Sequence, residues 1–318
     1  MITLNLNDLE RSQIKYKINR FPDGQQDIVL ENRVNTDKFG GGEVDLTTLA
    51  NSGINKTGVQ IISRFNSFRD LELILCATAA LRRLHVQEID LYTPYMLGAR
   101  SDIDFTKGKG GTSYEVDIVA PIINAQNYRS VTVMDPHSTV MHACIKNLTP
   151  ISNVEFVEQV FRDNDWTDEF VIVSPDAGAL KKIYDVASHL VSNGYDATEI
   201  AIGNKHRDIS TGKILSTGIS DINKYILNGY KFIIIDDICD GGRTFTELAG
   251  AISHEALKLG HSIPMGQIPE PEVYLIVTHG IFSAGMEALS GSLAGVFSTN
   301  SYSDRPNDSP YLKQTKII

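Results

Sequence analysis

Short apolar runs alternate with amphipathic segments along most of the chain. The apolar runs are rich in β-branched residues and end at turn-forming residues, which is typical of buried strands. These runs predict strands at residues 2–6, 14–18, 26–31, 59–63, 88–92, 130–134, 170–173, 199–202, 232–235, 273–278 and 295–298. Apolar residues at helical spacing predict helices at residues 71–84, 116–123, 138–147, 179–191 and 245–259. The alternation of the two patterns predicts an α/β protein whose sheets are mostly parallel and flanked by helices.

The same rhythm runs through both halves of the chain, so we predict two α/β domains of related fold. We place the first domain at residues 1–150 and the second at residues 151–300, and we expect residues 301–318 to pack back on the first. A length of 318 residues is sufficient for two domains, each with its own hydrophobic core.

Composition narrows the class of protein. Hydrophobic residues make up 42% and charged residues 21% of the chain, which is ordinary for a soluble globular protein. The formal net charge of −10 argues against a nucleic-acid-binding surface. The three cysteines are far apart in sequence, which favours free thiols and a reducing compartment. The N-terminal residues lack the pattern of a signal peptide, and no apolar run approaches the ~18 residues that cross a membrane. We therefore expect a cytoplasmic protein.

Residues 231–245 carry the strongest chemical signal. The apolar run in this segment ends in two adjacent carboxylates, Asp236 and Asp237, and a helical pattern begins at Phe245. The backbone N–H groups of a glycine loop at a helix N-terminus attract phosphate, whereas paired acids repel it. One interpretation is that the acids bind sugar hydroxyls or a metal beside a bound phosphate. The alternative is an ordinary strand–turn–helix whose acids are solvated. The loop between the acids and the helix comprises Asp240, Gly241, Gly242, Arg243 and Thr244.

Three further strand ends carry polar clusters. If the strands are parallel, the loops that follow them converge on one edge of a sheet. A carboxylate and an imidazole would suit a metal that carries phosphate, since Mg²⁺ usually takes one or two protein ligands plus phosphates. The alternatives are a structural histidine and a turn residue before a helix. The clusters are Asp135 with His137, Asp176 with Gly178, and Lys205 with Arg207.

Basic residues follow two of the predicted strands. Lys205 and Arg207 alternate along the chain, so both side chains can point the same way and stabilise charge on a transferring phosphoryl group. The alternative is that they are solvated surface charges. A long loop at residues 100–114 begins with Arg100 and Asp102, and an arginine there can clamp a polyphosphate or stack on a purine.

A series of short motifs spans nearly the whole chain in a definite order. They are R-F-P-D-G at 20–24, G-A-R-S-D at 98–102, D-P-H at 135–137, S-P-D-A-G at 174–178, K-H-R at 205–207, I-I-D-D-I-C-D at 234–240 and T-H-G at 278–280. In this combination the chain resembles the ribose-phosphate pyrophosphokinases, the enzymes that make phosphoribosyl pyrophosphate (PRPP).

The resemblance implies a pair of phosphoribosyltransferase-like domains and a homo-oligomer, from dimers up to hexamers. It also implies transfer of the β,γ-diphosphate of Mg·ATP onto the anomeric hydroxyl of a ribose 5-phosphoryl acceptor, with release of AMP. By position, it assigns Mg²⁺ binding to His137 and Asp176, and stabilisation of the transition state to Lys205 and Arg207.

The resemblance also assigns residues to the two substrates. Two of the residues that would contact ATP, Phe21 and Asp23, would reach in from a neighbouring subunit. The full ATP set is Phe21, Asp23, Arg100, Ser101, Asp102 and His137. The acceptor would be held at its ribose hydroxyls by Asp236 and Asp237, and at its phosphate by Asp240, Gly241, Gly242, Arg243 and Thr244.

The phosphate loop departs from the family pattern. The family usually has D-T-x-G-T where this chain has D-G-G-R-T at 240–244, and Gln25 replaces a usual acidic residue. Arg243 adds charge and bulk to a nest that needs small residues. Its side chain could fold outward without a role, or it could recognise a larger 5′ group such as a diphosphate. These changes resemble a divergent subgroup found in phage genomes beside nicotinamide-salvage genes, which implies ADP-ribose as a candidate acceptor. We therefore expect an acceptor longer than ribose 5-phosphate and, for a phage-encoded chain, the host cytoplasm.

Two other functions are compatible with the motifs. A phosphoribosyltransferase shares the acidic loop, but it would need neither the 100–114 loop, nor Lys205 and Arg207, nor two full domains. A regulatory homologue without turnover is compatible with the departures at Gln25 and Arg243, and at Ile103, where the family usually has a basic residue. The retained Lys205, Arg207, His137 and Asp176 argue against it.

Overall fold

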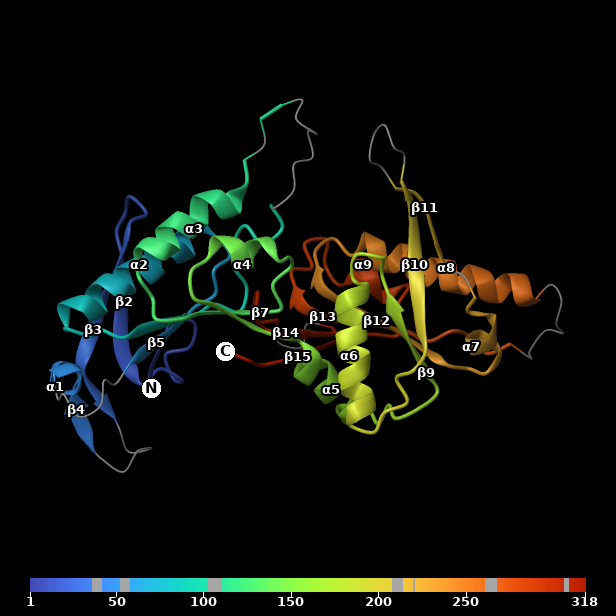
Figure 1. Cartoon of the computed structure of the whole chain (residues 1–318), viewed down its shortest axis with the longest axis horizontal. Coiled ribbons are helices and arrows are strands. Elements are labelled where there is room, and N and C mark those ends of the chain that lie inside the picture. The colour runs from blue at the N-terminus through green and yellow to red at the C-terminus, as the bar shows by residue number, and fades with distance from the viewer. Residues whose placement is uncertain are drawn as a thin grey trace. The chain divides into compact units, whose positions relative to one another are not determined.

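The chain forms two compact units. The computed structural model describes residues 1–35, 42–51, 58–101, 110–111, 113–207, 214–219, 221–260, 268–305 and 309–318. The first unit is Met1–Ile151 together with Ile318, and the second is Ser152–Ile317. In each unit, Figure 1 shows strands gathered into a sheet with helices packed beside it. The expected α/β class with mostly parallel sheets is confirmed.

The first unit is built on a five-stranded parallel sheet with the spatial order β1-β5-β6-β7-β8. Its strands are β1 (Ile2–Asn5), β5 (Val59–Ile62), β6 (Ile89–Tyr92), β7 (Val131–Met134) and β8 (Leu148–Ile151). A smaller antiparallel sheet comprises β2 (Ile14–Arg20), β3 (Gln26–Asn35) and β4 (Glu43–Asp45). The helices are α1 (Leu46–Asn51), α2 (Phe68–Arg83), α3 (Glu115–Ala125) and α4 (Val140–Cys144). The described strands of the larger sheet follow one another in a single direction, so their order does not reverse.

Helix α2 shows how local sequence sets these elements. The Ser67 side chain accepts a hydrogen bond from the Asp70 N–H, and the Asp70 carboxylate accepts one from the Ser67 N–H. Beyond this capping box, the helix buries Leu71, Ile74 and Leu81 in the core of the parallel sheet. The periodicity therefore predicts the buried face correctly, but it starts the helix late because the first turn is polar or exposed.

The second unit is built on a seven-stranded sheet with the spatial order β11-β10-β9-β12-β13-β14-β15. Strand β11 runs antiparallel to β10, and the other neighbours are parallel. In Figure 1, β10 and β11 extend as a two-stranded arm. The strands are β9 (Phe170–Ser174), β10 (Ile200–Arg207), β11 (Ile214–Ile219), β12 (Lys231–Cys239), β13 (Val273–Gly280), β14 (Gly295–Thr299) and β15 (Leu312–Thr315). The helices are α5 (Val154–Asp163), α6 (Leu180–Ser192), α7 (Asn223–Leu227), α8 (Arg243–Gly260) and α9 (Glu287–Ser290).

Strand β12 lies at the centre of this sheet, and the sheet is covered on both faces. Phe232 and Ile234 of β12 belong to the apolar core that contains Leu248 of α8. Neighbouring residues of a strand face opposite sides. On the other side, Phe161 of α5 packs edge-on against Phe170 of β9 with ring centroids 4.9 Å apart. Burial on both faces explains the continuous apolar run of the sequence at this strand.

The strand order of the second sheet reverses between β9 and β12. Strands β9, β10 and β11 extend to one side, and β12 to β15 extend to the other. In such a sheet, ligands bind outside the carboxyl ends of the strands at the point of reversal. Parallel pairing sets Ile234 of β12 opposite Val173 of β9, so the loops after these two strands leave the same edge. This edge is therefore where a ligand is expected to bind in the second unit.

The C-terminal residues join the second unit, so the expectation that residues 301–318 pack on the first is wrong. Strand β15 pairs in parallel with β14. Leu312 of β15 is 5% exposed and belongs to the same core as Val296 of β14. This pairing buries an apolar side chain and covers backbone groups that the edge of β14 would otherwise expose. Of the described C-terminal residues, Ile318 is the one grouped with the first unit.

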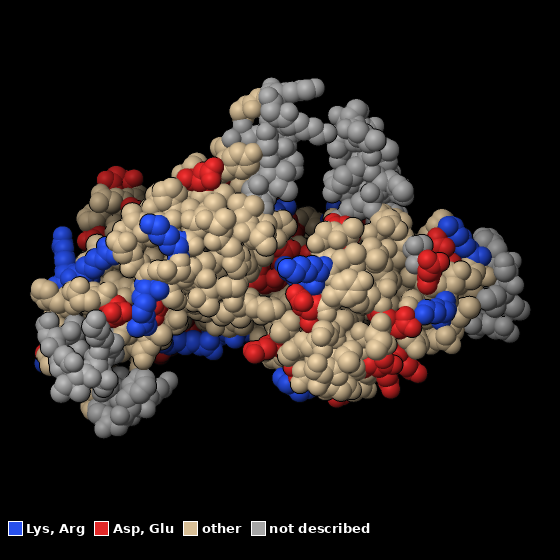
Figure 2. Space-filling view, viewed as in Figure 1, with Lys and Arg blue, Asp and Glu red and all other residues tan. Residues whose placement is uncertain are grey.

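Acidic and basic side chains intermingle at the surface. On the face shown in Figure 2, Lys and Arg lie near Asp and Glu over both units. Mixed charges of this kind produce local fields rather than one extended basic surface. None of the described helices is both long and apolar enough to span a membrane.

Candidate active site

Two adjacent carboxylates lie at the end of the central strand of the second sheet. Asp237 is 4% exposed and Asp236 is half-buried, and the Asp237 N–H donates a 2.9 Å hydrogen bond to Asp236 Oδ1. Burial raises the pKa of Asp236 well above its usual range, and the neighbouring Asp237 charge raises it further. Lys182 Nζ lies 3.8 Å from Asp237 Oδ2, and its charge acts to lower the Asp236 pKa. These surroundings disfavour two full negative charges side by side.

The loop after these acids depends on a glycine. Gly242 has a φ of +79°, in the left-handed region, and a Cβ added there would lie 2.5 Å from Leu289 Cδ2. The Gly242 carbonyl accepts hydrogen bonds from Phe245 N and Thr246 N, which closes the first turn of α8. The first N–H groups of a helix have no partner within the helix. Those of Arg243 and Thr244 come before these bonded groups, so the start of α8 with its preceding glycines is suited to an anion.

Other residues of this loop fix its position and its charge. The Asp240 carbonyl accepts a hydrogen bond from Ser283 N, which ties the loop to the segment after β13. Arg243 begins α8, and its Nε donates a 2.6 Å hydrogen bond to Glu247 Oε1 one turn later. The Arg243 side chain is 78% exposed. The Arg243 side chain thus points to solvent and is held along the helix by Glu247, while Thr244 is half-buried.

The loop after β9 is held by its own aspartate. Asp176 Oδ1 accepts hydrogen bonds from Gly178 N at 3.0 Å and Ala179 N at 3.2 Å, just before α6 begins. The Ser174 hydroxyl donates to the Asp176 carbonyl at 2.8 Å. These bonds fix the backbone of the loop at the sheet edge where β12 also ends. Asp176 is therefore a turn residue before a helix, as one of the two alternatives predicted. Its carboxylate lies at the point where the strand order reverses.

Gly203 of β10 lets this strand pack closely against the loop that follows β9. A Cβ added to Gly203 would lie 2.8 Å from the Pro175 carbonyl oxygen and 3.2 Å from Leu248 Cδ1. Only a residue without a side chain allows such a close backbone approach. Lys205 and Arg207 follow on the same strand, opposite Thr217 and Ile214 of β11, and the register shifts between His206 and Arg207. The directions of the Lys205 and Arg207 side chains lie outside the described structure.

The candidate ATP residues lie in the first unit. Phe21 and Asp23 form the tip of the β2–β3 hairpin, where the Asp23 carboxylate accepts a hydrogen bond from Gln25 N. Phe21 is 48% exposed there. Arg100 is exposed, and the Ser101 hydroxyl donates to the Ser113 carbonyl and accepts from Glu115 N, which ties the base of the 100–114 loop to α3. Asp102 lies outside the described residues, as do Ile103 and the lysines that follow it.

The two expected metal ligands lie in different units. His137 is exposed on the loop after β7, next to a segment in which buried Asp135 has a left-handed φ of 43°. Among the residues that the structure describes, no group of three or more His, Cys, Asp or Glu side chains is arranged to hold a metal ion. Mg²⁺ prefers oxygen and often takes one or two carboxylates, with phosphates completing its shell. Asp176 fits that chemistry, and the imidazole of His137 fits it less well.

Two positions of this site, Lys182 and Gly203, are absent from the sequence-based set. Nothing in the helical pattern distinguishes Lys182 from the adjacent Lys181. A glycine within a strand, in contrast, is a usable sign of close backbone approach, and Gly203 carries that sign. Cys239 lies close by but is a core group, because it is fully buried in the apolar core, and this burial raises the pKa of its thiol to about 12.

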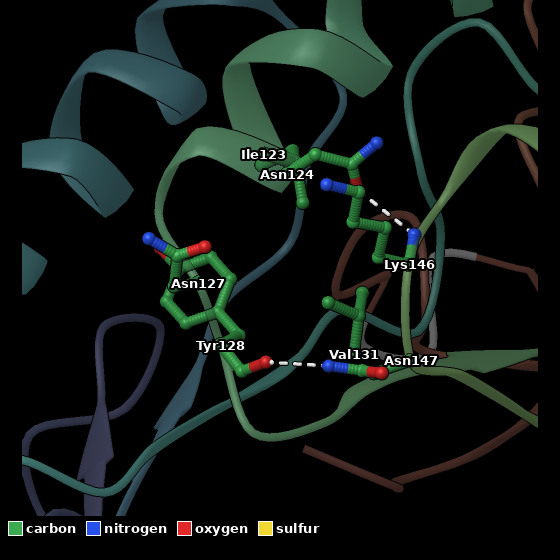
Figure 3. A pocket seen from close by; sticks show the side chains of 7 residues that line it. All are labelled: Ile123, Asn124, Asn127, Tyr128, Val131, Lys146 and Asn147. Atoms are coloured by element: carbon green, nitrogen blue, oxygen red, sulfur yellow. Dashed lines mark hydrogen bonds between the residues drawn. The ribbon is translucent and has the colours of Figure 1, made fainter.

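The first unit contains a small polar cavity that is structural. It has a volume of about 110 Å³, and Figure 3 shows the side chains that line it. Its amide side chains already bond to the backbone: Asn124 Oδ1 accepts from Lys146 N at 2.8 Å, and Asn147 Nδ2 donates to the Tyr128 carbonyl at 3.1 Å. These bonds join the end of α3 to the start of β8, so the polar lining is explained by the turns it holds.

Comparison with known proteins points to one group of enzymes. The profile of the phosphoribosyl transferase domain family matches residues 146–258, which include the acid pair and the glycine loop. A ribose-phosphate pyrophosphokinase of Maricaulis maris is 27% identical over 289 residues, which cover 88% of this chain and 83% of that protein. A ribose-phosphate pyrophosphokinase of Fusobacterium nucleatum is 26% identical over 273 residues, which cover 85% of this chain and 72% of that protein.

A solved structure extends the likeness to the fold. The crystal structure of phosphoribosylpyrophosphate synthetase from Mycobacterium smegmatis matches with a TM-score of 0.72 at 16% sequence identity. The match covers 97% of this chain and 88% of that chain. The resemblance suggested by the sequence motifs is thereby confirmed, and so is the expected fold.

Replacing Asp236 by asparagine should stabilise the second unit at neutral pH. A carboxyl whose pKa is raised in the folded protein holds more protons there than in the unfolded chain, so stability falls as pH rises above the unfolded pKa of about 3.9. Asp236→Asn removes this loss. We expect its Tm to exceed that of the unsubstituted protein by a few degrees at pH 7, with the difference vanishing near pH 3. Exposed Asp185→Asn on α6 is the control. A gain that is independent of pH would contradict the assignment.

Adding a methyl group at Gly203 should destabilise the second unit. The new Cβ would meet a backbone carbonyl, which cannot move aside cheaply, so we expect Gly203→Ala to lower the free energy of unfolding by about 1–3 kcal/mol. Gly218→Ala in the paired strand β11 is the matched control, because a Cβ there meets no atom within 4 Å. Denaturant titration of both variants measures the difference. Equal stabilities would show that the loop after β9 does not depend on Gly203.

Proposed function

Since the chain is a divergent relative of the ribose-phosphate pyrophosphokinases, we propose that it moves the β,γ-diphosphate of Mg·ATP onto the anomeric hydroxyl of a ribose 5-phosphoryl acceptor. AMP is the second product. The observation that carries the proposal is the combination of an acid pair and a glycine nest at the strand reversal of the second sheet. The acid pair suits the hydroxyls of a sugar, and the glycine nest suits its phosphate.

The acceptor is held by two kinds of group. Asp236 and Asp237 accept hydrogen bonds from the 2- and 3-hydroxyls of the ribose, and the N–H groups of residues 241–244 bind its 5-phosphate. Transfer then forms a bond between the anomeric oxygen and the β-phosphorus and breaks the bond from that phosphorus to the oxygen of AMP, while the hydroxyl proton is released. Such a reaction needs positioning and charge stabilisation rather than covalent catalysis.

The remaining residues act on the nucleotide. Lys205 and Arg207 stabilise negative charge on the transferred diphosphate. Mg²⁺, carried in with ATP, would neutralise part of that charge, with Asp176 as the better-suited ligand and His137 as the second. Phe21 and Asp23 would serve a neighbouring subunit of a homo-oligomer, which the exposed position of Phe21 at a hairpin tip supports. The ATP set is Phe21, Asp23, Arg100, Ser101, Asp102 and His137.

For the acceptor, we assign ADP-ribose in preference to ribose 5-phosphate. Arg243 is the first residue of α8, and its exposed guanidinium is paired with Glu247 one turn later. ADP-ribose carries a diphosphate where ribose 5-phosphate ends in a monophosphate, and the additional charge matches that guanidinium. The product would be ADP-ribose pyrophosphate, in a phage-encoded route that salvages NAD.

A phosphoribosyltransferase is the second candidate, because the matched family profile covers that domain type. Such an enzyme would consume PRPP and would not use ATP. Incubation with PRPP and a nucleobase, with and without ATP, distinguishes the two functions. A regulatory homologue would show neither activity.

Replacing Lys205 by alanine should slow the reaction while the protein stays folded. Loss of a group that stabilises charge in the transition state typically lowers kcat by roughly 10²–10³-fold. AMP release from Mg·ATP with a saturating acceptor measures the effect. Lys258→Ala is the control, because Lys258 pairs with Glu255 at the far end of α8. An unchanged kcat in Lys205→Ala would remove this residue from the mechanism.

The choice of acceptor is tested by supplying Mg·ATP with ribose 5-phosphate or with ADP-ribose and measuring AMP release. We expect a higher kcat/KM with ADP-ribose. Arg243→Gly should then lower kcat/KM for ADP-ribose by about tenfold, the equivalent of one charged hydrogen bond, and leave ribose 5-phosphate little affected. Glu247→Gln, which keeps the arginine, should retain the preference. Faster turnover of the unsubstituted protein with ribose 5-phosphate would sink the ADP-ribose assignment.

A further inference from the structure

One cation faces the acid pair from a neighbouring element. Lys182 is the third residue of α6, and its Nζ lies 3.8 Å from Asp237 Oδ2. The Lys182 side chain is 26% exposed and that of Asp237 is 6% exposed. The distance is that of an ion pair rather than of a direct hydrogen bond. A largely buried carboxylate therefore has a half-buried ammonium group within short electrostatic range.

The fold, rather than sequence proximity, brings these two residues together. Helix α6 follows β9, and β9 pairs in parallel with β12. The first turn of α6 therefore stands at the same sheet edge as the end of β12. Ile183 and Val186 of α6 are fully buried, and Lys182 lies beside that buried stripe, whereas Lys181 is exposed.

A cation such as Lys182 has a particular electrostatic role beside the buried acid pair. A surface ion pair contributes little to stability, but a buried carboxylate next to a second carboxylate is strongly disfavoured in its charged form. Lys182 acts against that penalty: it lowers the pKa that burial and Asp237 raise at Asp236. A carboxylate that stays ionised is also a stronger hydrogen-bond acceptor than a neutral carboxyl group.

We propose that Lys182 is a positioning residue for acceptor binding: its ammonium group, 3.8 Å from Asp237 Oδ2, holds the Asp237 carboxylate aimed at a ribose hydroxyl. This inference rests on the proposed function, in which the acid pair holds the acceptor. Lys182 does not touch the transferred diphosphate in this account. Its loss should therefore weaken acceptor binding and leave ATP binding alone.

The experiment compares Lys182→Met, Lys182→Gln and Lys182→Arg with the exposed control Lys181→Met in the full-length protein. Initial rates of AMP release are measured over a grid of ATP and acceptor concentrations, with ribose 5-phosphate and with ADP-ribose. We expect Lys182→Met and Lys182→Gln to raise the acceptor KM about tenfold or more, with the ATP KM within about twofold. Lys182→Arg should restore most of the acceptor affinity, and Lys181→Met should change neither constant.

A purely structural role for Lys182 has a different signature. It would lower Tm and kcat and shift both KM values together, or it would leave the acceptor KM unchanged, and each of these results overturns the inference. Failure of the Lys182 inference must be distinguished from failure of the proposed function. Isothermal titration of ribose 5-phosphate and ADP-ribose into the ATP-free protein makes this distinction, because it measures acceptor binding without the reaction. If the unsubstituted protein binds an acceptor without releasing AMP, the pyrophosphokinase function fails. The ratio of its Kd to that of Lys182→Met still decides the role of Lys182.

Discussion

Two negative charges side by side, at the end of a strand buried on both faces, are the constraint on which the site of the second unit depends. Burial disfavours the ionised form of Asp236, and the neighbouring charge of Asp237 disfavours it further. A fold driven by stability alone would not place carboxylates there. They persist because the apolar packing of β12 and α8 fixes the strand end regardless, and because Lys182 offsets part of the repulsion. An unfavourable group held by favourable surroundings is typical of a binding site.

The loops around the acid pair are fixed by backbone geometry. Asp176 caps its own loop through two backbone N–H groups. Gly203 lets β10 approach the Pro175 carbonyl, and Gly242 adopts a left-handed turn beneath Leu289. Each contact limits where the backbone can lie, so the chain itself fixes the loops around the acid pair. The first unit is different, because its described sheet has no strand reversal and its candidate residues lie on a hairpin tip and on loops.

Much of this architecture could be predicted from local patterns. The apolar run at residues 232–235 gave the central strand, and helical spacing gave α6 and α8. Helix α5 is absent from the predicted elements, although its buried stripe is equally regular and includes Phe156, Val160 and Phe161. The same periodicity therefore predicts it. Strand β15 was not predictable in the same way, because Leu312–Thr315 shows little apolar pattern and becomes a strand only by pairing with β14. The domain to which the C-terminal residues belong was missed for the same reason.

The sequence by itself determined the α/β rhythm, the acid pair and the glycine loop, because periodicity and turn chemistry act between residues close in the chain. Only the tertiary structure decided which strands are neighbours. That choice placed the loops after β9 and β12 at one edge, brought Lys182 within 3.8 Å of Asp237, and set Gly203 against Pro175. These contacts join segments far apart in sequence, and they form because burying both faces of one sheet fixes the strand order and the helices above it.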